Sequence, residues 1–149
     1  MISISILASL PQASHAHIMS AQSEHTGHCL CGRTRYRAKG DPAWSCYCHC
    51  ESCRRATGAP VTAYAGFALA DFTFEGDAPG RYESSPGVTR SFCRTCGTPL
   101  TYQTAEWPDE IHLLVGSADQ PQSLAPQRHV FDGERISWVF LNFWTVRAL

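Results

Sequence analysis

The chain has 149 residues, a hydrophobic fraction of 44% and a formal net charge of −1. This length and composition fit one globular domain with a buried core and exclude a disordered chain. The near-neutral charge provides no basic surface for DNA or RNA, so we expect no nucleic-acid partner.

Residues 1–22 differ in composition from the rest of the chain. The first eleven residues are apolar and serine-rich, as in the middle of an export signal, but no Lys or Arg precedes Arg33. The apolar run is too short to span a bilayer, and we expect no membrane contact. Residues 1–22 are expected to be a flexible tail or a mis-assigned start, with a cleaved export signal as the alternative. Residues 23–149 are expected to form a single zinc domain.

Short β-prone runs alternate with Gly, Pro and Asp and predict a mainly β fold. Strands are predicted at 33–39, 61–67, 72–76, 88–92, 99–103, 110–116 and 137–143. Turns are predicted at 40–42, 76–80, 84–87 and 107–109. One short helix is predicted at 50–58, ended by Gly58. The aromatic residues expected in the core are Trp44, Tyr64, Phe67, Phe72, Phe74 and Trp138.

Two distant cysteine pairs are each followed by glycine, as in zinc knuckles. They are Cys29 with Cys31, and Cys93 with Cys96. Together they can supply four thiolates to a closed tetrahedral zinc site, and disulfides or buried free cysteines are the alternatives. Arg33 and Arg94 adjoin the pairs and are placed to offset their negative charge. We expect the chain in the cytoplasm, where clustered cysteines bind metal more often than they pair.

The stretch CYCHCESC contains the other four of the eight cysteines. If its first five residues are extended, Cys46, Cys48 and Cys50 share one face, and Cys53 then closes a short loop with Cys50. Cys48, Cys50 and Cys53 can therefore converge on one metal and leave a fourth position open. Zinc enzymes use this arrangement to bind water or a substrate, and a zinc-bound thiol loses its proton. The spacing thus predicts a site for a thiolate substrate.

Three polar neighbours of this second group each have two interpretations. His49 points to the opposite face, where a structural hydrogen bond is favoured over metal binding. Arg54 and Arg55 follow the last cysteine directly. They are candidates for contacts with the carboxylates of a thiol substrate, and a solvated basic turn is the alternative.

In order and spacing these motifs resemble the glutathione-dependent formaldehyde-activating enzyme family, which includes centromere protein V. The resemblance covers about residues 27–138 and rests on GHCLCG, CHCESCRRATGAP, RSFCRTCGTPLTY and a later HVF…W. It implies a β-tent zinc fold with about two zinc ions per chain. The structural zinc would bind Cys29, Cys31, Cys93 and Cys96, and the catalytic zinc would bind Cys48, Cys50 and Cys53. The implied activity is a carbon–sulfur lyase reaction in which glutathione and formaldehyde interconvert with S-hydroxymethylglutathione.

Cys46 departs from the family pattern, and three roles are open to it. It can pack as a small buried hydrophobe, act as a fourth ligand that closes the second site, or pair with Cys48 on oxidation. A closed site would favour a non-enzymatic zinc module that binds another protein. Clustered thiols would also allow a redox switch. A lyase acting on a small thiol adduct, with glutathione as one candidate thiol, is the main hypothesis.

Overall fold

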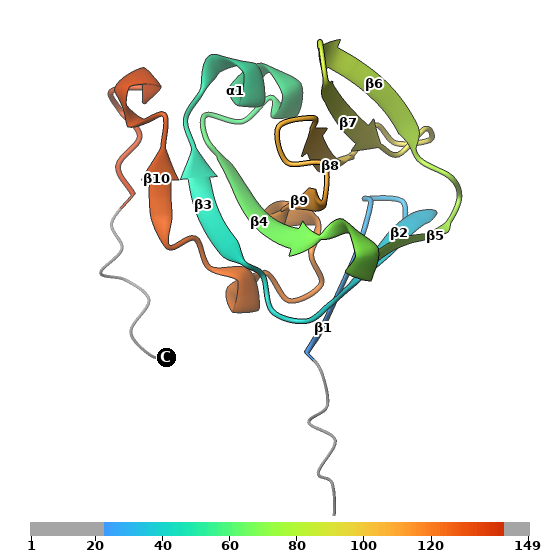
Figure 1. Ribbon diagram of the computed structural model, residues 1–149. Coiled ribbons are helices and arrows are strands. Elements are labelled where there is room, and N and C mark those ends of the chain that lie inside the picture. The colour runs from blue at the N-terminus through green and yellow to red at the C-terminus, as the bar shows by residue number, and fades with distance from the viewer. Residues whose placement is uncertain (1–22, 142–149) are drawn as a thin grey trace, which may run out of the picture.

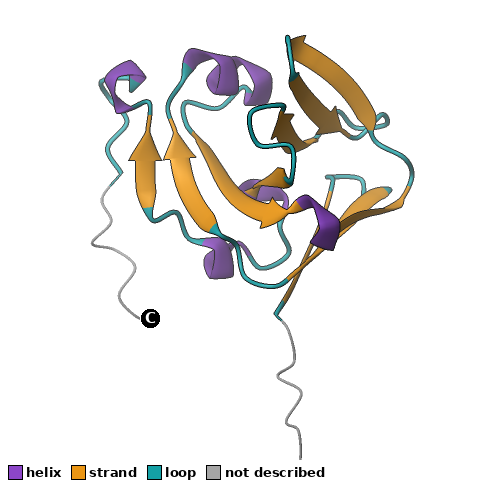
Figure 2. Ribbon diagram, in the orientation of Figure 1, coloured by secondary structure: helices purple, strands orange, loops and turns teal. Residues whose placement is uncertain are grey.

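A computed structural model of the chain describes residues 23–141 (Figure 1). The predictions for residues 1–22 lie outside the described residues. The described part contains ten β-strands, one α-helix and short 3₁₀ turns (Figure 2). The expected mainly β fold with one short helix is therefore confirmed. Among residues 23–141, no helix combines the length and the hydropathy that crossing a membrane requires.

The smaller of two sheets has three antiparallel strands. They are β1 (Glu24–His28), β2 (Thr34–Lys39) and β5 (Phe72–Gly76), with β2 in the centre. Along β2 the side chains alternate, so that Tyr36 and Ala38 are buried. On the outer face Arg37 donates to Glu75 at 3.0 Å and to Glu24 at 3.2 Å. One face of this sheet is thus apolar and packs inward.

The larger sheet has seven strands, and the one helix of the described residues follows β3 (Trp44–Cys48) in the chain. In spatial order the strands are β10 (Arg128–Val130), β3 (Trp44–Cys48), β4 (Thr62–Ala68), β9 (Glu110–Leu114), β8 (Pro99–Thr104), β7 (Val88–Phe92) and β6 (Gly80–Ser85). All neighbours are antiparallel except β10, which is parallel to β3. The helix α1 (Glu51–Thr57) ends at Gly58, whose φ of 64° favours glycine, as predicted.

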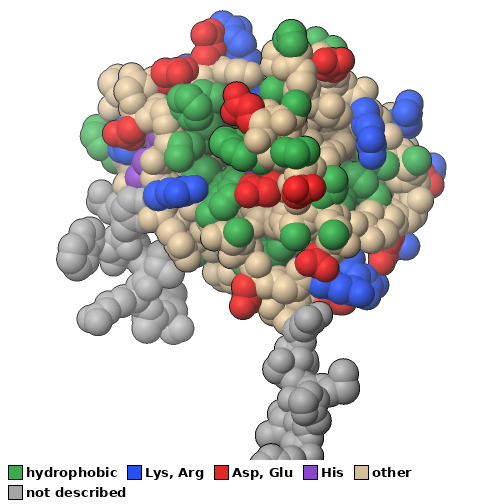
Figure 3. All heavy atoms as spheres, viewed as in Figure 1, with side chains coloured by type: hydrophobic (Ala, Val, Ile, Leu, Met, Phe, Trp, Pro, Cys, Tyr) green, Lys and Arg blue, Asp and Glu red, His purple; other side chains and the backbone are tan. Residues whose placement is uncertain are grey.

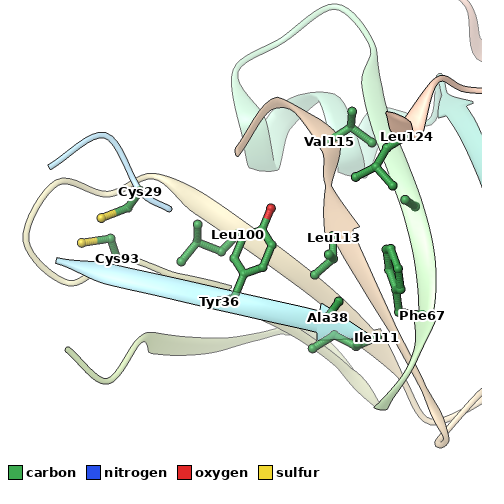
Figure 4. Close-up of a cluster of buried hydrophobic side chains, with 11 residues drawn as sticks. Cys29, Tyr36, Ala38, Phe67, Cys93, Leu100, Ile111, Leu113, Val115 and Leu124 are labelled. Atoms are coloured by element: carbon green, nitrogen blue, oxygen red, sulfur yellow. The ribbon is translucent and has the colours of Figure 1, made fainter. Parts of the chain in front are cut away.

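The main core lies between the two sheets (Figure 4). Its buried residues are Cys29, Tyr36, Ala38, Ala65, Phe67, Cys93, Leu100, Ile111, Leu113, Val115 and Leu124. Leu100 enters this core at a bulge, because the register of β7 and β8 shifts between Ser91 and Phe92. Tyr102 packs with a different set of residues, so the bulge directs Leu100 and Tyr102 to opposite sides of β8.

A second apolar cluster lies on the other face of the large sheet. It contains Cys46, Cys48, Cys53, Tyr64 and Leu114, with Trp44, Cys50, Tyr102 and Val130 packed against it. Strand alternation explains the separation, since Tyr64 and Leu114 adjoin Ala65 and Leu113, which belong to the main core. The predicted site of Cys48, Cys50 and Cys53 therefore lies on the face of the large sheet that is turned away from the small sheet.

The structure corrects the strand predictions at several places. The strands β1, β3, β6 and β10 were not predicted as such, and 110–116 ends two residues early because Val115–Ser117 forms a 3₁₀ turn. The strand predicted at 137–143 is wrong within its described residues. Trp138 lies in a turn and is 65% exposed rather than in the core. Strand propensity measures how well side chains fit a pleated, half-buried surface. Residues 137–141 pair with no strand of either sheet, so their propensity is not realised.

Gly27 on β1 provides a test of the packing between the sheets. A Cβ atom here would lie 2.3 Å from the Tyr36 hydroxyl and 2.5 Å from the carbonyl oxygen of Ser117. We expect Gly27→Ala to lower the free energy of unfolding by about 3 kcal/mol, because a backbone oxygen cannot move aside. Denaturant unfolding would measure this. Gly133→Ala is the control, since nothing lies within 4 Å of its Cβ position, and equal midpoints for both variants would contradict the prediction.

Candidate functional site

The two distant cysteine pairs meet in one cluster. The Sγ atoms of Cys29, Cys31, Cys93 and Cys96 all lie within 4.8 Å of one another. The Cys29–Cys31 sulfur distance is 3.5 Å and the Cys31–Cys93 distance is 3.7 Å. A tetrahedral zinc with normal Zn–S bonds requires a sulfur separation of about 3.8 Å. All eight cysteines are free, so this cluster fits a metal ion and contains no disulfide.

Hydrogen-bond donors surround these sulfurs. The backbone N–H of Thr34 donates to Cys29 Sγ at 3.4 Å, and the Thr98 hydroxyl lies 3.2 Å from Cys96 Sγ. The Thr98 contact lowers the pKa of Cys96 to about 5. Because Cys29 follows β1 and Cys96 lies between β7 and β8, a metal here would tie the small sheet to the large one.

The arginines predicted to offset the charge of this cluster have other partners. Arg33 lies 3.9 Å from Asp77, and Arg94 donates to the carbonyl oxygen of Pro79 at 3.3 Å. Both arginine side chains point along the surface to groups outside the cluster. Backbone and hydroxyl donors contact the sulfurs instead.

Three of the other four cysteines form a second cluster. The Sγ atoms of Cys48, Cys50 and Cys53 lie within 4.8 Å of one another, with 3.5 Å between Cys48 and Cys50. Cys48 ends β3, Cys50 is the N-cap of α1, and the backbone N–H of Cys53 donates to Cys50 Sγ at 3.3 Å. The hydrogen bond from Cys48 lowers the pKa of Cys53 to about 5. This donor set could hold a metal ion through three protein ligands.

Cys46 lies on the same face of β3 but outside this three-sulfur group. It is 4% exposed and packs in the same apolar cluster as Tyr64 and Leu114. Burial raises the pKa of its thiol to about 11, which keeps it protonated at neutral pH. The placement supports the interpretation of Cys46 as a small buried side chain and provides no geometry for a fourth ligand.

His49 points away from the cysteine cluster, as predicted, and its ring is fully buried. Its Nε2 lies 2.8 Å from Nδ1 of His129 and 3.9 Å from Asp132. These three residues are close enough to share an ion. However, the Arg135 guanidinium contacts both His129 and Asp132 and already brings a positive charge there. These contacts connect β10 and the turn after it to the segment between β3 and α1, where His49 lies.

The two arginines that follow the cluster point away from it. Arg54 donates to the backbone carbonyl oxygens of His49 and Glu134. Arg55 pairs with Glu51 at 2.7 Å on the outer side of α1. Neither lines the cavity that contains the three sulfurs. Their contact with a substrate stays a prediction, and this geometry does not favour it.

Arg90 on β7 is the guanidinium that lies beside the cluster, and sequence reasoning missed it. Its Nη2 is 4.0 Å from Cys53 Sγ and donates to the Ser52 hydroxyl at 3.1 Å. Its Nη1 donates to the Tyr64 hydroxyl at 3.4 Å, and the guanidinium lies 5.0 Å from the centre of the Tyr102 ring. The sequence contains no indication of this contact, because β7 reaches β3 only across three intervening strands.

The three sulfurs line a cavity of about 560 Å³. The other lining residues include Trp44, Cys46, Ser52, Tyr64, Val88, Arg90, Tyr102, Glu106, Trp107, Glu110, His112, Arg128, Val130 and Phe131. Figure 3 shows hydrophobic side chains gathered near the middle of one face with acidic side chains beside them, the combination that also lines this cavity. The second cluster thus has an accessible side, and the cavity beside it has the size and the mixed apolar and charged lining of a small-molecule site.

Three comparisons with known proteins each give a match. The model of the glutathione-dependent formaldehyde-activating enzyme family matches residues 24–134. An uncharacterized lyase of Schizosaccharomyces pombe is 36% identical over 80 residues, which cover 53% of this chain and 57% of the relative. The match therefore spans little more than half of that relative. The fold is similar to the crystal structure of a Rhodobacter sphaeroides protein, with a TM-score of 0.55 and 25% identity, covering 70% of this chain and 99% of the other.

Proposed function

The chain belongs to the glutathione-dependent formaldehyde-activating enzyme family, and from this premise we propose that it is a zinc-dependent carbon–sulfur lyase acting on a thiol adduct of formaldehyde. The family and the lyase-named relative support a lyase-like role. The observation that carries the finer proposal is the three-sulfur group of Cys48, Cys50 and Cys53 on the wall of a 560 Å³ cavity. A protein-interaction module would need no such opening beside its metal.

The residues around the cavity suit thiolate chemistry. Zinc bound by the three sulfurs would keep a thiol substrate, for which we propose glutathione, in its thiolate form. In the reaction the thiolate sulfur bonds to the carbon of formaldehyde and the oxygen takes up a proton, and the reverse breaks the C–S bond. The Arg90 guanidinium, 4.0 Å from Cys53 Sγ, offsets the negative charge that collects on the sulfurs. The Ser52 hydroxyl beside it is a further donor for the oxygen that becomes negative.

The four-cysteine cluster has a structural role in this proposal. We propose that Cys29, Cys31, Cys93 and Cys96 hold a structural zinc, because four sulfurs leave no position open for a substrate. This assignment gives about two zinc ions per chain. Free thiols throughout the described chain agree with the cytoplasm as the proposed location, where thiols stay reduced.

The proposal is tested by the rate of exchange between the adduct and its parts. The uncatalysed addition of a thiol to formaldehyde is already fast, so exchange NMR at equilibrium is the suitable measurement. We expect micromolar zinc-loaded protein to accelerate the exchange of S-hydroxymethylglutathione with glutathione and formaldehyde at least about tenfold. Metal-free protein is the control. Exchange at the uncatalysed rate, with both zinc ions present by metal analysis, would refute the lyase proposal.

A further inference from the structure

The end of the cavity away from the sulfurs of Cys48, Cys50 and Cys53 has its own set of polar groups. Along β3, Trp44 lies four residues before Cys48. In an extended strand this places it about 13 Å from the cysteine end. Across the sheet Trp44 pairs with Gly66, and Gly66 pairs with His112. The cavity is lined by Trp44 and His112 at one end and by the three sulfurs at the other.

Glycine at position 66 determines where the Trp44 indole lies. A Cβ atom on Gly66 would come within 2.3 Å of Trp44 Cε2, so the ring rests directly on the backbone of β4. In this position Trp44 Nε1 donates to Glu110 Oε2 at 3.1 Å. His112 Nε2 lies 3.3 Å from the same oxygen and must carry a proton to bond with it, because a carboxylate only accepts. Two donors therefore fix Glu110.

The second oxygen of Glu110 remains available to a ligand. Within the described residues, Oε1 of Glu110 accepts no hydrogen bond. The guanidinium of Arg128 lies over the face of the same indole, 5.7 Å from the ring centre. No described carboxylate lies within salt-bridge distance of Arg128, although both Arg128 and Glu110 line the cavity. The indole of Trp44 thus has an unpaired cation over its face and a fixed carboxylate at its edge.

We propose that Trp44, Glu110 and Arg128 form a head-group subsite that binds the ammonium and carboxylate groups of an amino-acid end of the substrate, with Glu110 as the specificity-determining residue for the ammonium. The inference rests on the proposed function, which places the substrate sulfur at the cysteine end. A cation over the face of one ring and a carboxylate at its edge match a zwitterion, whereas a simple amine would be repelled by Arg128. Free cysteine is too short, because its amino and carboxylate groups adjoin the carbon that bears the sulfur. The substrate therefore carries its head group on a spacer.

Binding of a probe without a free thiol tests the subsite apart from catalysis. S-methylglutathione retains the amino-acid end, and its N-acetyl derivative lacks the ammonium charge. With the zinc-loaded wild type, we expect calorimetry to show about tenfold weaker binding of the N-acetyl form, as for loss of one charge-assisted hydrogen bond. Glu110→Gln should weaken S-methylglutathione about tenfold and leave the N-acetyl form unchanged. Glu83→Gln, which removes the same charge outside the cavity, should change neither affinity.

The affinities of the wild type and the variants for the two probes distinguish a loss of ammonium recognition from a structural defect. Glu110→Asp keeps the charge and should retain part of the preference for the free ammonium, and circular dichroism confirms that each variant is folded. Equal weakening of both probes by Glu110→Gln, or no effect of N-acetylation on the wild type, would overturn the subsite. Failure of S-methylglutathione to bind the wild type would overturn it as well. Exchange catalysis is measured independently, so loss of the subsite and loss of the lyase proposal are distinct results.

Discussion

Cys53→Ser is expected to lower the zinc content from about two ions per chain to about one and to reduce turnover by more than about 100-fold, while the chain stays folded. Cys53 is 6% exposed, and its sulfur lies within 4.8 Å of those of Cys48 and Cys50. A serine hydroxyl is a poor zinc ligand, so two sulfurs would remain for the ion. The four-cysteine cluster shares no residue with this group, and its zinc should be retained. Metal analysis and exchange NMR on the same preparation measure both effects.

Cys46→Ser is the matched control for this prediction. Cys46 is buried on the same face of β3, two residues before Cys48, but outside the three-sulfur group. We expect this variant to keep about two zinc ions and most of the wild-type turnover. If Cys46→Ser instead lost the second zinc, Cys46 would be a ligand and the site would be closed. Retention of zinc and turnover in Cys53→Ser would show that the ligand assignment is wrong.

The cysteine groups were predictable from sequence because the relevant geometry is local. Cys50 and Cys53 lie in one turn, and the period of an extended strand brings Cys48 to the same side. The arginine contacts were not predictable in this way. Arg54 is adjacent in sequence to the cluster, but it bonds to backbone carbonyls, whereas Arg90 arrives from a strand four positions away in the sheet. Proximity in sequence therefore grouped the cysteines correctly and placed the wrong arginines beside them.

The same contrast holds for the fold. Runs rich in β-branched and aromatic residues, such as 61–67 and 88–92, matched β4 and β7 closely. The parallel contact of β10 with β3 could not be derived, because it joins segments about 80 residues apart, as the bond between His49 and His129 illustrates. Along β9 the alternation of side chains puts Glu110 and His112 on one face of the strand. Only the order of the strands in the sheet shows that this face lines the cavity.

Removal of the metal from the four-cysteine cluster is expected to unfold the chain. Cys29 and Cys93 are 0% and 1% exposed and belong to the main core, so a metal-free cluster would leave closely spaced thiols in the interior between the sheets. Structural zinc sites contribute about 10 kcal/mol or more, which equals the whole stability of a typical domain. We therefore expect a strong chelator, or the substitution Cys93→Ser, to abolish the cooperative thermal transition. Circular dichroism melting, followed by return of zinc, measures the effect and its reversibility.

The variant Cys53→Ser makes this test specific to one cluster. It should hold only the zinc of the four-cysteine cluster and melt cooperatively near the wild-type temperature until the chelator removes that ion. The four-cysteine cluster connects the turn after β1 to the turn between β7 and β8, and hence one sheet to the other. The second cluster spans only the end of β3 and the start of α1, and its metal should matter little for folding. Cooperative melting of a fully metal-free chain would contradict the structural role of the first cluster.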